Sequence, residues 1–444
     1  MIRKIIRAIL NLTLRIFFRR IEVTGEDCVP PNGPVIFVLN HPNGLVDPVF
    51  LLCLAPRRVS FLAKAPLFRM PIVGYFVRAL DSLPVYRHQD QGADTARNQE
   101  TFAACRALLL RGGTLAIFPE GVSHDGPQLK PLKTGTARIA LGAAAGREID
   151  LKIVPAGLYY TAKTTFRSSA LLHFGTPVDV PRVELGADGE PPRESVRALS
   201  EQIEAALREV ILHAEHDKAL ETVARAERIF SSDETLSLER ELKLRRRFVA
   251  GYNFLRTRAP ERLATLEARL DRYEEELRQL DLDPQDLTTT AYSKTAIARY
   301  LLTRTSVFLF LTPFALVGAV AHYPAYRLVG VIAVKLTKKQ NDVFSTFKIM
   351  AAMLLFPLTW LGWAALAAYF FNFAAALATL LLLPLAGYAA IHYFEELDRF
   401  TSGARALLYF FTRRWFFLQL LAERRAIREE IIALAGIAAS PETP

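Results

Sequence analysis

The fold of this chain is decided around the stretch VIFVLNHPNGLVDP, which occupies residues 35–48. Its first five residues are all apolar, which is the pattern of a buried strand. Two prolines and a glycine then break regular structure. His41 and Asp47 therefore leave the end of a strand within one tight turn. A histidine can take a proton from a hydroxyl near neutral pH, and a neighbouring carboxylate can orient it.

A purely structural role fits the same two residues about equally well. Asp47 could cap the helix that follows, in a solvated turn that has no catalytic function. The rest of the sequence must therefore decide between a catalytic pair and a helix cap.

Residues 21–185 are predicted to form one α/β domain. Short apolar runs alternate there with helical patterns, an order that is typical of a mostly parallel sheet flanked by helices. In such sheets the working side chains sit at the carboxyl ends of strands, where His41 and Glu120 both fall. The runs predicted to be strands are 35–39, 59–62, 115–118, 153–158 and 171–174.

A second turn carries the letters FPEG at residues 118–121, where a proline and Gly121 break the chain. Glu120 is a carboxylate at a strand end, and backbone N–H groups in such a turn can hold a phosphate or an oxyanion. Lys130 and Lys133 precede a predicted helix in a basic loop that also suits a phosphate. Ordinary surface charge is the alternative for both lysines.

Two further cations follow apolar segments of the same domain. Arg87 is the better candidate for a phosphate contact, because a guanidinium matches phosphate oxygens bidentately. Lys64 offers a single point charge. Taken alone, each of them is more typical of a surface cation.

The composition narrows the functional classes. The chain has 444 residues, of which 51% are hydrophobic and 23% are charged, and its formal net charge is +10. A basic protein suits nucleic acid, an anionic membrane surface or anionic substrates. The sequence has no zinc-finger spacing and no basic-aromatic RNA motif, so a nucleic-acid partner is not expected. Its three scattered cysteines predict neither a disulfide framework nor a metal site.

Residues 1–20 have the pattern of a basic amphipathic helix. Arginines recur at four-residue steps and form a polar stripe, while isoleucine, leucine and phenylalanine cover much of the rest. We expect this helix to lie in a membrane interface. The alternative is an amphipathic helix that packs on its own domain.

The C-terminal part of the chain predicts membrane helices. Residues 193–300 carry helical periodicity with dense mixed charge, but no charged residue falls between 349 and 394. One helix of that length would overshoot a hydrocarbon core of ~30 Å about twofold, so two spans joined near Asn372 fit better. Residues 305–394 are therefore predicted to hold transmembrane or re-entrant helices, and residues 404–435 an interfacial helix.

Basic residues flank the later pair of spans on both sides. The positive-inside rule then puts both ends of the pair in the cytoplasm, together with the α/β domain. The stretch 305–334 also has positive charge on both sides, so it either dips into the membrane and returns or crosses it fully. A soluble helical bundle is the alternative for the whole region.

Taken in this order, the motifs resemble those of the glycerolipid acyltransferase superfamily over about residues 20–180. The resemblance rests on the NHPNGLVD turn, on Val85-Tyr86-Arg87, on FPEG and on the letters IVPAG at 153–157. The usual motif has four residues between its His and its Asp, whereas this chain has five. That spacing is more similar to the yeast-type glycerol-3-phosphate/dihydroxyacetone-phosphate acyltransferases. A weaker likeness to them continues into the block at 333–348.

The resemblance implies the fold and the roles of the site residues. The fold would be the α/β acyltransferase fold, followed by a helical region and C-terminal membrane helices. His41 would be the general base and Asp47 its orienter. The implied or candidate substrate-binding residues are Lys64, Arg87 for phosphate, Glu120 and Gly121 for a glycerol phosphate, Lys133, and Pro155 in an apolar wall near the acyl chain.

The resemblance also implies a reaction at a phospholipid membrane. The enzyme would transfer a fatty acyl group from acyl-CoA or acyl-carrier protein to glycerol-3-phosphate or 1-acyl-glycerol-3-phosphate in phospholipid synthesis. The acyl donor would be a co-substrate, and no bound cofactor or metal is expected. Two alternatives remain, which are an acyltransferase for another lysophospholipid or alcohol and a non-catalytic membrane scaffold.

Overall fold

The chain divides into two compact units. The first consists of Met1–Glu215 and Thr337–Ile349, and the second of His216–Leu336 and Met350–Pro444. The first unit therefore combines the predicted α/β domain with a short segment from the C-terminal third of the chain. The computed structural model describes residues 2–86, 98–126, 128–214, 217–230, 237–280, 282, 294–337 and 340–439.

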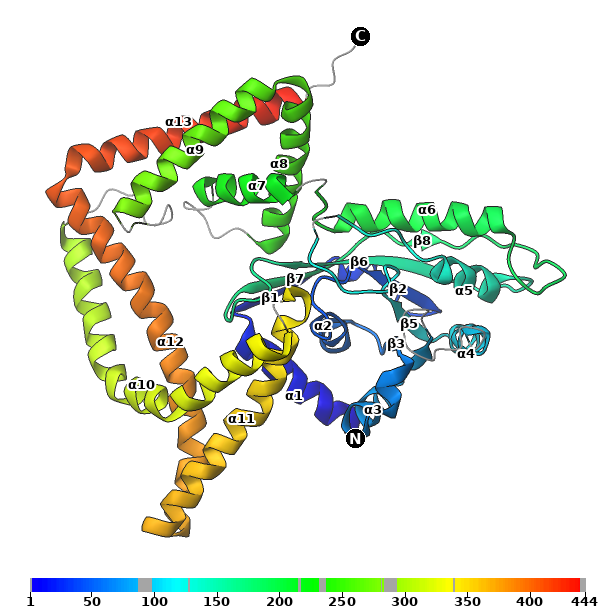
Figure 1. The fold of residues 1–444 in the computed structure, drawn as a ribbon, viewed down its shortest axis with the longest axis horizontal. Coiled ribbons are helices and arrows are strands. Elements are labelled where there is room, and N and C mark those ends of the chain that lie inside the picture. The colour runs from blue at the N-terminus through cyan, green and yellow to red at the C-terminus, as the bar shows by residue number, and fades with distance from the viewer. Residues whose placement is uncertain are drawn as a thin grey trace. The chain divides into compact units, whose positions relative to one another are not determined.

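The described residues of the first unit form an eight-stranded sheet (Figure 1). The strands pair in the order β1-β7-β6-β2-β5-β3-β4, and β8 pairs with β6. Strand β6 is antiparallel to β7 and β8, and the other neighbours are parallel, which confirms the predicted mostly parallel sheet. The strands are β1 Arg20–Thr24, β2 Val35–Leu39, β3 Ser60–Lys64, β4 Leu83–Val85, β5 Thr114–Ile117, β6 Lys152–Tyr160, β7 Ser169–Phe174 and β8 Val178–Asp179.

Strand β2 is buried on both faces because helices cover both sides of the sheet. None of its five residues has exposed surface. Its odd-numbered residues pack in one core with α1 and α2, and its even-numbered residues pack in a second core with α4, α5 and α6. Burial on both faces explains why the strand is a continuous apolar run. The helices of this unit are α1 Ile2–Phe17, α2 Val46–Leu54, α3 Pro71–Ala79, α4 Asn98–Leu110, α5 Gly135–Ala144 and α6 Arg193–Val210.

Helix α1 turns part of its basic stripe towards its own unit. The Arg3 guanidinium donates to the Val59 carbonyl oxygen at 2.7 Å, and that of Arg7 donates to the Cys53 carbonyl oxygen at 2.8 Å. The helix therefore packs on the α/β domain through arginines as well as through apolar residues. It also leaves an exposed aliphatic stripe, which consists of Ile2, Ile5, Ile9, Leu12 and Ile16.

In the second unit, helices α7, α8, α9 and α13 pack together. The Arg424 guanidinium of α13 is buried and donates to the Ile229 carbonyl oxygen of α7 at 2.8 Å. Arg269 of α9 forms ion pairs with Glu423 and Glu430 of α13. These helices are α7 Asp217–Phe230, α8 Leu238–Arg258, α9 Pro260–Gln279 and α13 Arg414–Ala439.

The structure differs from the single helix predicted over 404–435. Helix α12 ends at Thr412 and α13 begins at Arg414, so the predicted helix is divided between them. Phe417 and Ile427 of α13 are buried, so α13 packs among the helices of the second unit. An aromatic and basic sequence pattern is shared by interfacial helices and by helices that bury one face in a bundle.

Three helices among the described residues are long and apolar enough to cross a membrane. The candidate spans are Thr305–Thr337, Asn341–Phe370 and Phe373–Asp398. Many of their large side chains are exposed, for example Phe310 at 72% and Tyr369 at 82%. Such exposure argues against a soluble helical bundle and indicates membrane association. The spans belong to α10 Lys294–Thr337, α11 Asn341–Phe370 and α12 Phe373–Thr412.

Helix α10 is continuous and bends sharply along its length (Figure 1). It contains Pro313 and Pro324, and a proline inside a helix removes a backbone hydrogen bond and favours a kink. The stretch 305–334 therefore lies in one bent helix, and the number of membrane crossings stays a prediction. Residues 371 and 372 separate α11 from α12, where the junction near Asn372 is expected.

Helices α10 and α12 approach closely at Gly318. A Cβ atom on Gly318 would lie 2.0 Å from the Ala386 carbonyl oxygen. One turn later, His322 Nδ1 donates to the Gly318 carbonyl oxygen at 2.7 Å, and its Nε2 accepts from the Trp360 indole N–H at 2.8 Å. The buried imidazole thereby joins α10 to α11 beside the point where α12 packs.

We predict that Gly318→Ala destabilises the helical part of the protein. The added methyl group would overlap the Ala386 carbonyl oxygen, and overpacking of this kind typically costs about 1–3 kcal/mol. Thermal unfolding of the full chain in detergent measures the effect. The matched control is Gly330→Ala on the same helix, where a Cβ would meet nothing within 4 Å. Equal melting temperatures for the two variants would contradict the close approach.

Candidate active site

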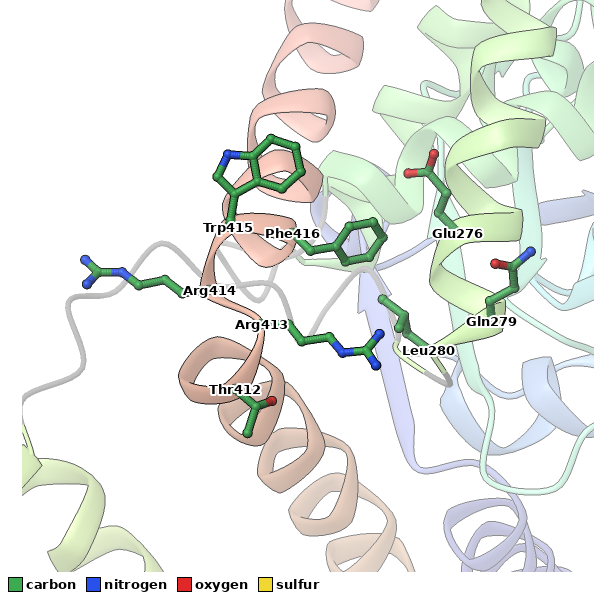
Figure 2. A pocket seen from close by; sticks show the side chains of 8 residues that line it. All are labelled: Glu276, Gln279, Leu280, Thr412, Arg413, Arg414, Trp415 and Phe416. Atoms are coloured by element: carbon green, nitrogen blue, oxygen red, sulfur yellow. The ribbon is translucent and has the colours of Figure 1, made fainter.

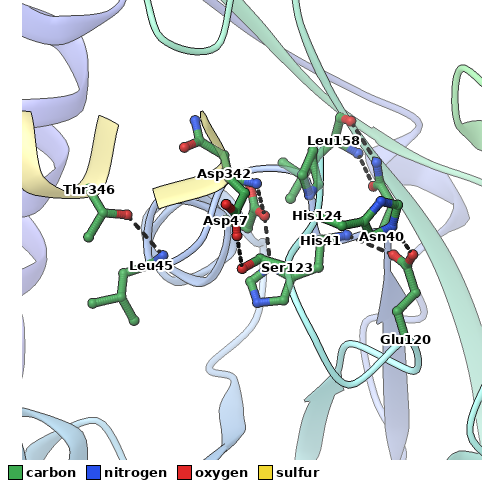
Figure 3. Close-up of polar contacts among 12 residues, drawn as sticks. Asn40, His41, Leu45, Asp47, Glu120, Ser123, His124, Leu158, Asp342 and Thr346 are labelled. Carbon is green, nitrogen blue, oxygen red and sulfur yellow. Dashed lines mark hydrogen bonds and ion pairs between the residues drawn. The ribbon is translucent and has the colours of Figure 1, made fainter. Parts of the chain in front are cut away.

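His41 in the turn after β2 and Asp47 in the first turn of α2 form a hydrogen-bonded pair (Figure 3). The distance from His41 Nδ1 to Asp47 Oδ2 is 2.8 Å. The Asp47 side chain is fully buried, and the imidazole is 17% exposed. Helix α2 has Leu45 as its N-cap with no side-chain capping bond, so Asp47 is not the cap of this helix. The helix-cap alternative is therefore not what the structure shows, and the catalytic role of the pair stays a prediction.

The Asp47 carboxylate accepts two further hydrogen bonds. The backbone N–H of Asn43 donates to Oδ2 at 2.7 Å, and the Tyr160 hydroxyl donates to Oδ1 at 2.7 Å. Burial raises the pKa of Tyr160 well above its ordinary value, and the charge of Asp47 adds to the effect. The phenol therefore stays protonated and acts as a donor. Because an ionised carboxylate can only accept, Nδ1 is the donor in this contact, and in a neutral imidazole Nε2 then carries the lone pair.

Two further contacts hold the surroundings of His41 in place. The Asn40 side-chain amide donates to the Leu158 carbonyl oxygen at 3.0 Å, and its oxygen accepts from the Leu158 backbone N–H at 2.8 Å. Asn40 thus continues the pairing of β2 with β6 beyond the last strand residue. The Phe118 ring stacks on the His41 imidazole with centroids 4.2 Å apart. The stacking of Phe118 limits how the imidazole can rotate.

Glu120 ties the FPEG turn to the same histidine. Its carboxylate accepts from the His41 backbone N–H at 3.0 Å and from the Lys130 backbone N–H at 3.1 Å, and it pairs with His124 Nε2. The His124 backbone N–H in turn donates to the His41 carbonyl oxygen at 3.1 Å. The Glu120 side chain is almost fully buried. Its observed contacts therefore organise the loop around His41 (Figure 3).

The structure brings some of the predicted substrate-binding residues together and leaves others apart. Gly121 has φ of +73°, and a Cβ there would lie 3.7 Å from Cγ of Lys133. Lys64 is exposed at the end of β3. Pro155 is buried inside β6, where it pairs with Val38 of β2. Arg87 lies outside the described residues.

Sequence reasoning missed Tyr160 and gave His124 no role. Tyr160 is separated from Asp47 by 113 positions, and it reaches the turn only because β6 lies beside β2. The apolar run that becomes β6 is visible in the sequence, but the order of strands in the sheet is not. His124 stands close to Glu120 in the sequence, which was a usable signal for their pairing.

A cavity of about 480 Å³ lies elsewhere, in the second unit. Basic and aromatic side chains at the junction of α12 and α13 line it, including Arg413, Arg414, Trp415 and Phe416, together with Glu276 and Leu280 of the α9 end (Figure 2). His41, Asp47 and Glu120 do not line it. The described residues also contain no cluster of three or more candidate metal ligands.

Two family models match the chain. Residues 20–159 match the acyltransferase family, and residues 222–439 match the glycerol-3-phosphate acyltransferase 2 C-terminal domain. The first match contains His41, Asp47 and Glu120, and the second contains all three candidate membrane spans. The matched regions therefore follow the division into an α/β domain and a C-terminal helical part.

Two curated relatives align with most of the chain. An uncharacterised acyltransferase of Schizosaccharomyces pombe is 24% identical over 87% of this chain and 73% of its own length. Glycerol-3-phosphate O-acyltransferase 1 of Saccharomyces cerevisiae is 28% identical over 80% of this chain, but over only 59% of its own length. The crystal structure of the 1-acyl-sn-glycerophosphate acyltransferase of Thermotoga maritima covers 47% of this chain and 80% of its own, with 20% identity and a TM-score of 0.34.

We predict that Tyr160→Phe destabilises the protein through Asp47. A hydrogen bond to a charged group contributes about 1.5–3 kcal/mol, and the phenol donates one to this buried carboxylate. Tyr160→Phe should lower the free energy of unfolding by less when Asp47→Asn has already removed the charge. Unfolding of both single variants and of the double variant gives the coupling energy. Strictly additive effects would show that the phenol and the carboxylate do not interact.

Proposed function

Because the chain belongs to the acyltransferase family and carries a glycerol-3-phosphate acyltransferase 2 C-terminal domain, we propose that it acylates glycerol-3-phosphate or 1-acyl-glycerol-3-phosphate. The fatty acyl group comes from acyl-CoA or acyl-carrier protein. One observation carries the proposal most directly. His41 is oriented through Nδ1 by a fully buried carboxylate, which leaves Nε2 as a base at the end of a central strand.

The proposed reaction is direct transfer to the acceptor. His41 Nε2 takes the proton of the acceptor hydroxyl while the hydroxyl oxygen attacks the carbonyl carbon of the thioester. The C–S bond then breaks, and the imidazolium returns the proton to the leaving thiolate. Asp47 stabilises the imidazolium between these steps. Proton transfer of this kind contributes about 10²–10⁴-fold, and no acyl-enzyme is required.

Glycerol-3-phosphate is the favoured acceptor. The C-terminal match and the yeast relative both bear the name of glycerol-3-phosphate acyltransferases. The five residues between His41 and Asp47 point the same way, since this spacing departs from the commoner four. The acceptor stays a proposal, because the matched part covers 59% of the yeast enzyme.

The reaction is proposed to take place at the cytoplasmic face of a membrane. Long-chain acyl donors and lysophospholipid products partition into bilayers, and this chain has three candidate spans. The exposed aliphatic stripe of α1 fits a helix that lies in the interface, and basic residues on both sides of 349–394 favour a cytoplasmic orientation.

We predict that His41→Ala abolishes most acyl transfer without unfolding the protein. The base is lost, so the turnover number should fall by about 10²–10⁴-fold. The assay uses purified full-length protein, acyl-CoA and glycerol-3-phosphate, with the lipid products resolved. His173→Ala in β7 is the matched control and should remain active, because that histidine bonds Thr24 outside this site. Near-normal transfer by His41→Ala would refute the mechanism.

We predict that Arg87→Ala acts on phosphorylated acceptors alone. Loss of one charge-assisted hydrogen bond of about 1.5–3 kcal/mol should lower kcat/KM for glycerol-3-phosphate about 10- to 100-fold. A neutral alcohol acceptor should be affected little. An equal loss on both classes would argue that Arg87 does not contact phosphate. Activity of the wild-type protein on neutral acceptors alone would favour the alternative acceptor class.

A further inference from the structure

The first turns of α11 lie against the turn that carries His41 and Asp47, and both belong to the first unit. The backbone N–H of Leu45 donates to the Thr346 hydroxyl at 3.1 Å (Figure 3). Gly44 has φ of +43°, and a Cβ there would lie 2.9 Å from the Asp342 carbonyl oxygen. Helix α11 thus packs against the five residues that separate His41 from Asp47.

The same helical segment also binds the loop that follows FPEG. The Ser123 hydroxyl donates to Asp342 Oδ2 at 2.7 Å (Figure 3). The Asn341 side-chain amide donates to Asp125 Oδ2 at 2.7 Å. This loop is already joined to His41, because the His124 backbone N–H donates to the His41 carbonyl oxygen.

A third loop, which follows β6, completes the set of contacts. The Ser345 hydroxyl donates to the Lys163 carbonyl oxygen, and Lys348 Nζ donates to the Thr164 carbonyl oxygen at 3.0 Å. Lys163 Nζ reaches back to the Pro42 carbonyl oxygen at 2.9 Å. The start of α11 therefore contacts the loops after β5, β2 and β6, which are consecutive strands in the sheet.

Burial separates this segment from the rest of its helix. Ser345 is 0% exposed and Thr346 is 7% exposed, whereas Leu354 on the same helix is 62% exposed. A buried hydroxyl is costly unless it is hydrogen-bonded, and both hydroxyls have partners in the catalytic unit. These polar residues suit a protein surface and would be unfavourable in a lipid-facing position.

We propose that residues 341–348 are a positioning element of the active site, and this inference rests on the proposed acyl transfer. The segment holds the His41–Asp47 turn and the Ser123 loop in the arrangement that catalysis needs. Thr346 of this segment and Gly44 of the turn are the central contact residues. The helix that continues into a candidate membrane span therefore sets the geometry of the base, so the catalytic domain is incomplete without it.

The first test compares two glycine variants in the full-length protein. Gly44→Ala adds a methyl group where the Asp342 carbonyl oxygen lies, so the turn and the helix must separate. Gly146→Ala is the matched control, because Gly146 also has a positive φ of +62° but a Cβ there would meet nothing within 4 Å. We expect kcat of Gly44→Ala to fall at least about tenfold below that of the control.

The second test changes the Thr346 hydroxyl and keeps its shape. Thr346→Val removes the acceptor of the Leu45 N–H, and kcat should fall about three- to tenfold while KM stays within about twofold. Thr346→Ser keeps the hydroxyl and should recover most of the lost kcat. If Gly44→Ala does not fold, Thr346→Val still tests the positioning role, since valine is nearly isosteric with threonine and should leave the fold intact.

The outcomes separate this inference from the function on which it rests. A wild-type protein without acyl transfer to any acceptor would overturn the proposed function. An active wild type whose Gly44→Ala matches Gly146→Ala, with Thr346→Val fully active, would overturn the positioning role and leave the function intact. If Thr346→Val lowers kcat and Thr346→Ser does not restore it, the positioning role of the Thr346 hydroxyl would also be contradicted, because the effect would then not come from the hydroxyl.

Discussion

The buried carboxylate of Asp47 accepts hydrogen bonds from the His41 imidazole, the Asn43 backbone N–H and the Tyr160 hydroxyl, and the geometry of the whole site depends on it. A carboxylate without exposed surface is unfavourable unless such donors surround it. Two of these donors belong to the turn itself, and the third comes from β6. The pairing of β2 with β6 therefore supports the shape of the turn, and the contact with Asp47 orients the His41 ring through Nδ1.

Sheet topology supplies the rest of the arrangement. Strands β6, β2 and β5 are consecutive neighbours, with β2 parallel to both of the others, so the loops after their carboxyl ends meet at one edge. Tyr160, His41 and Glu120 come from these three positions. The start of α11 lies over the same loops, although it is about 300 residues away in the chain, as the contact between Leu45 and Thr346 spans 301 positions. This contact joins the turn after β2 to the helix that holds the candidate span Asn341–Phe370.

The central strand and the segment after it could be predicted, because both depend on local sequence patterns. Strand β2 is buried on both faces, which explains its apolar run. The breakers after it end the strand before His41, and Asp47 follows six positions after His41 in the first turn of α2. Helix α1 marks the limit of such reasoning. Its periodicity shows a basic and an apolar stripe, but Arg3 and Arg7 face the domain while Ile5 and Ile9 are exposed. Periodicity separates two faces of a helix and does not say which one packs inward.

The sequence alone determined the mostly parallel α/β domain, the histidine and aspartate after a strand end, and the apolar C-terminal helices. Each of these follows from a pattern of residues that are close together in the chain. Tertiary structure alone decided which distant groups complete the site. Tyr160 reaches Asp47 through strand pairing, and Thr346 reaches Leu45 through the packing of a helix. No local sequence pattern predicts either contact. The physical reason is that a hydrogen bond requires proximity in space, and the order of strands and the docking of helices create that proximity only when the whole core forms.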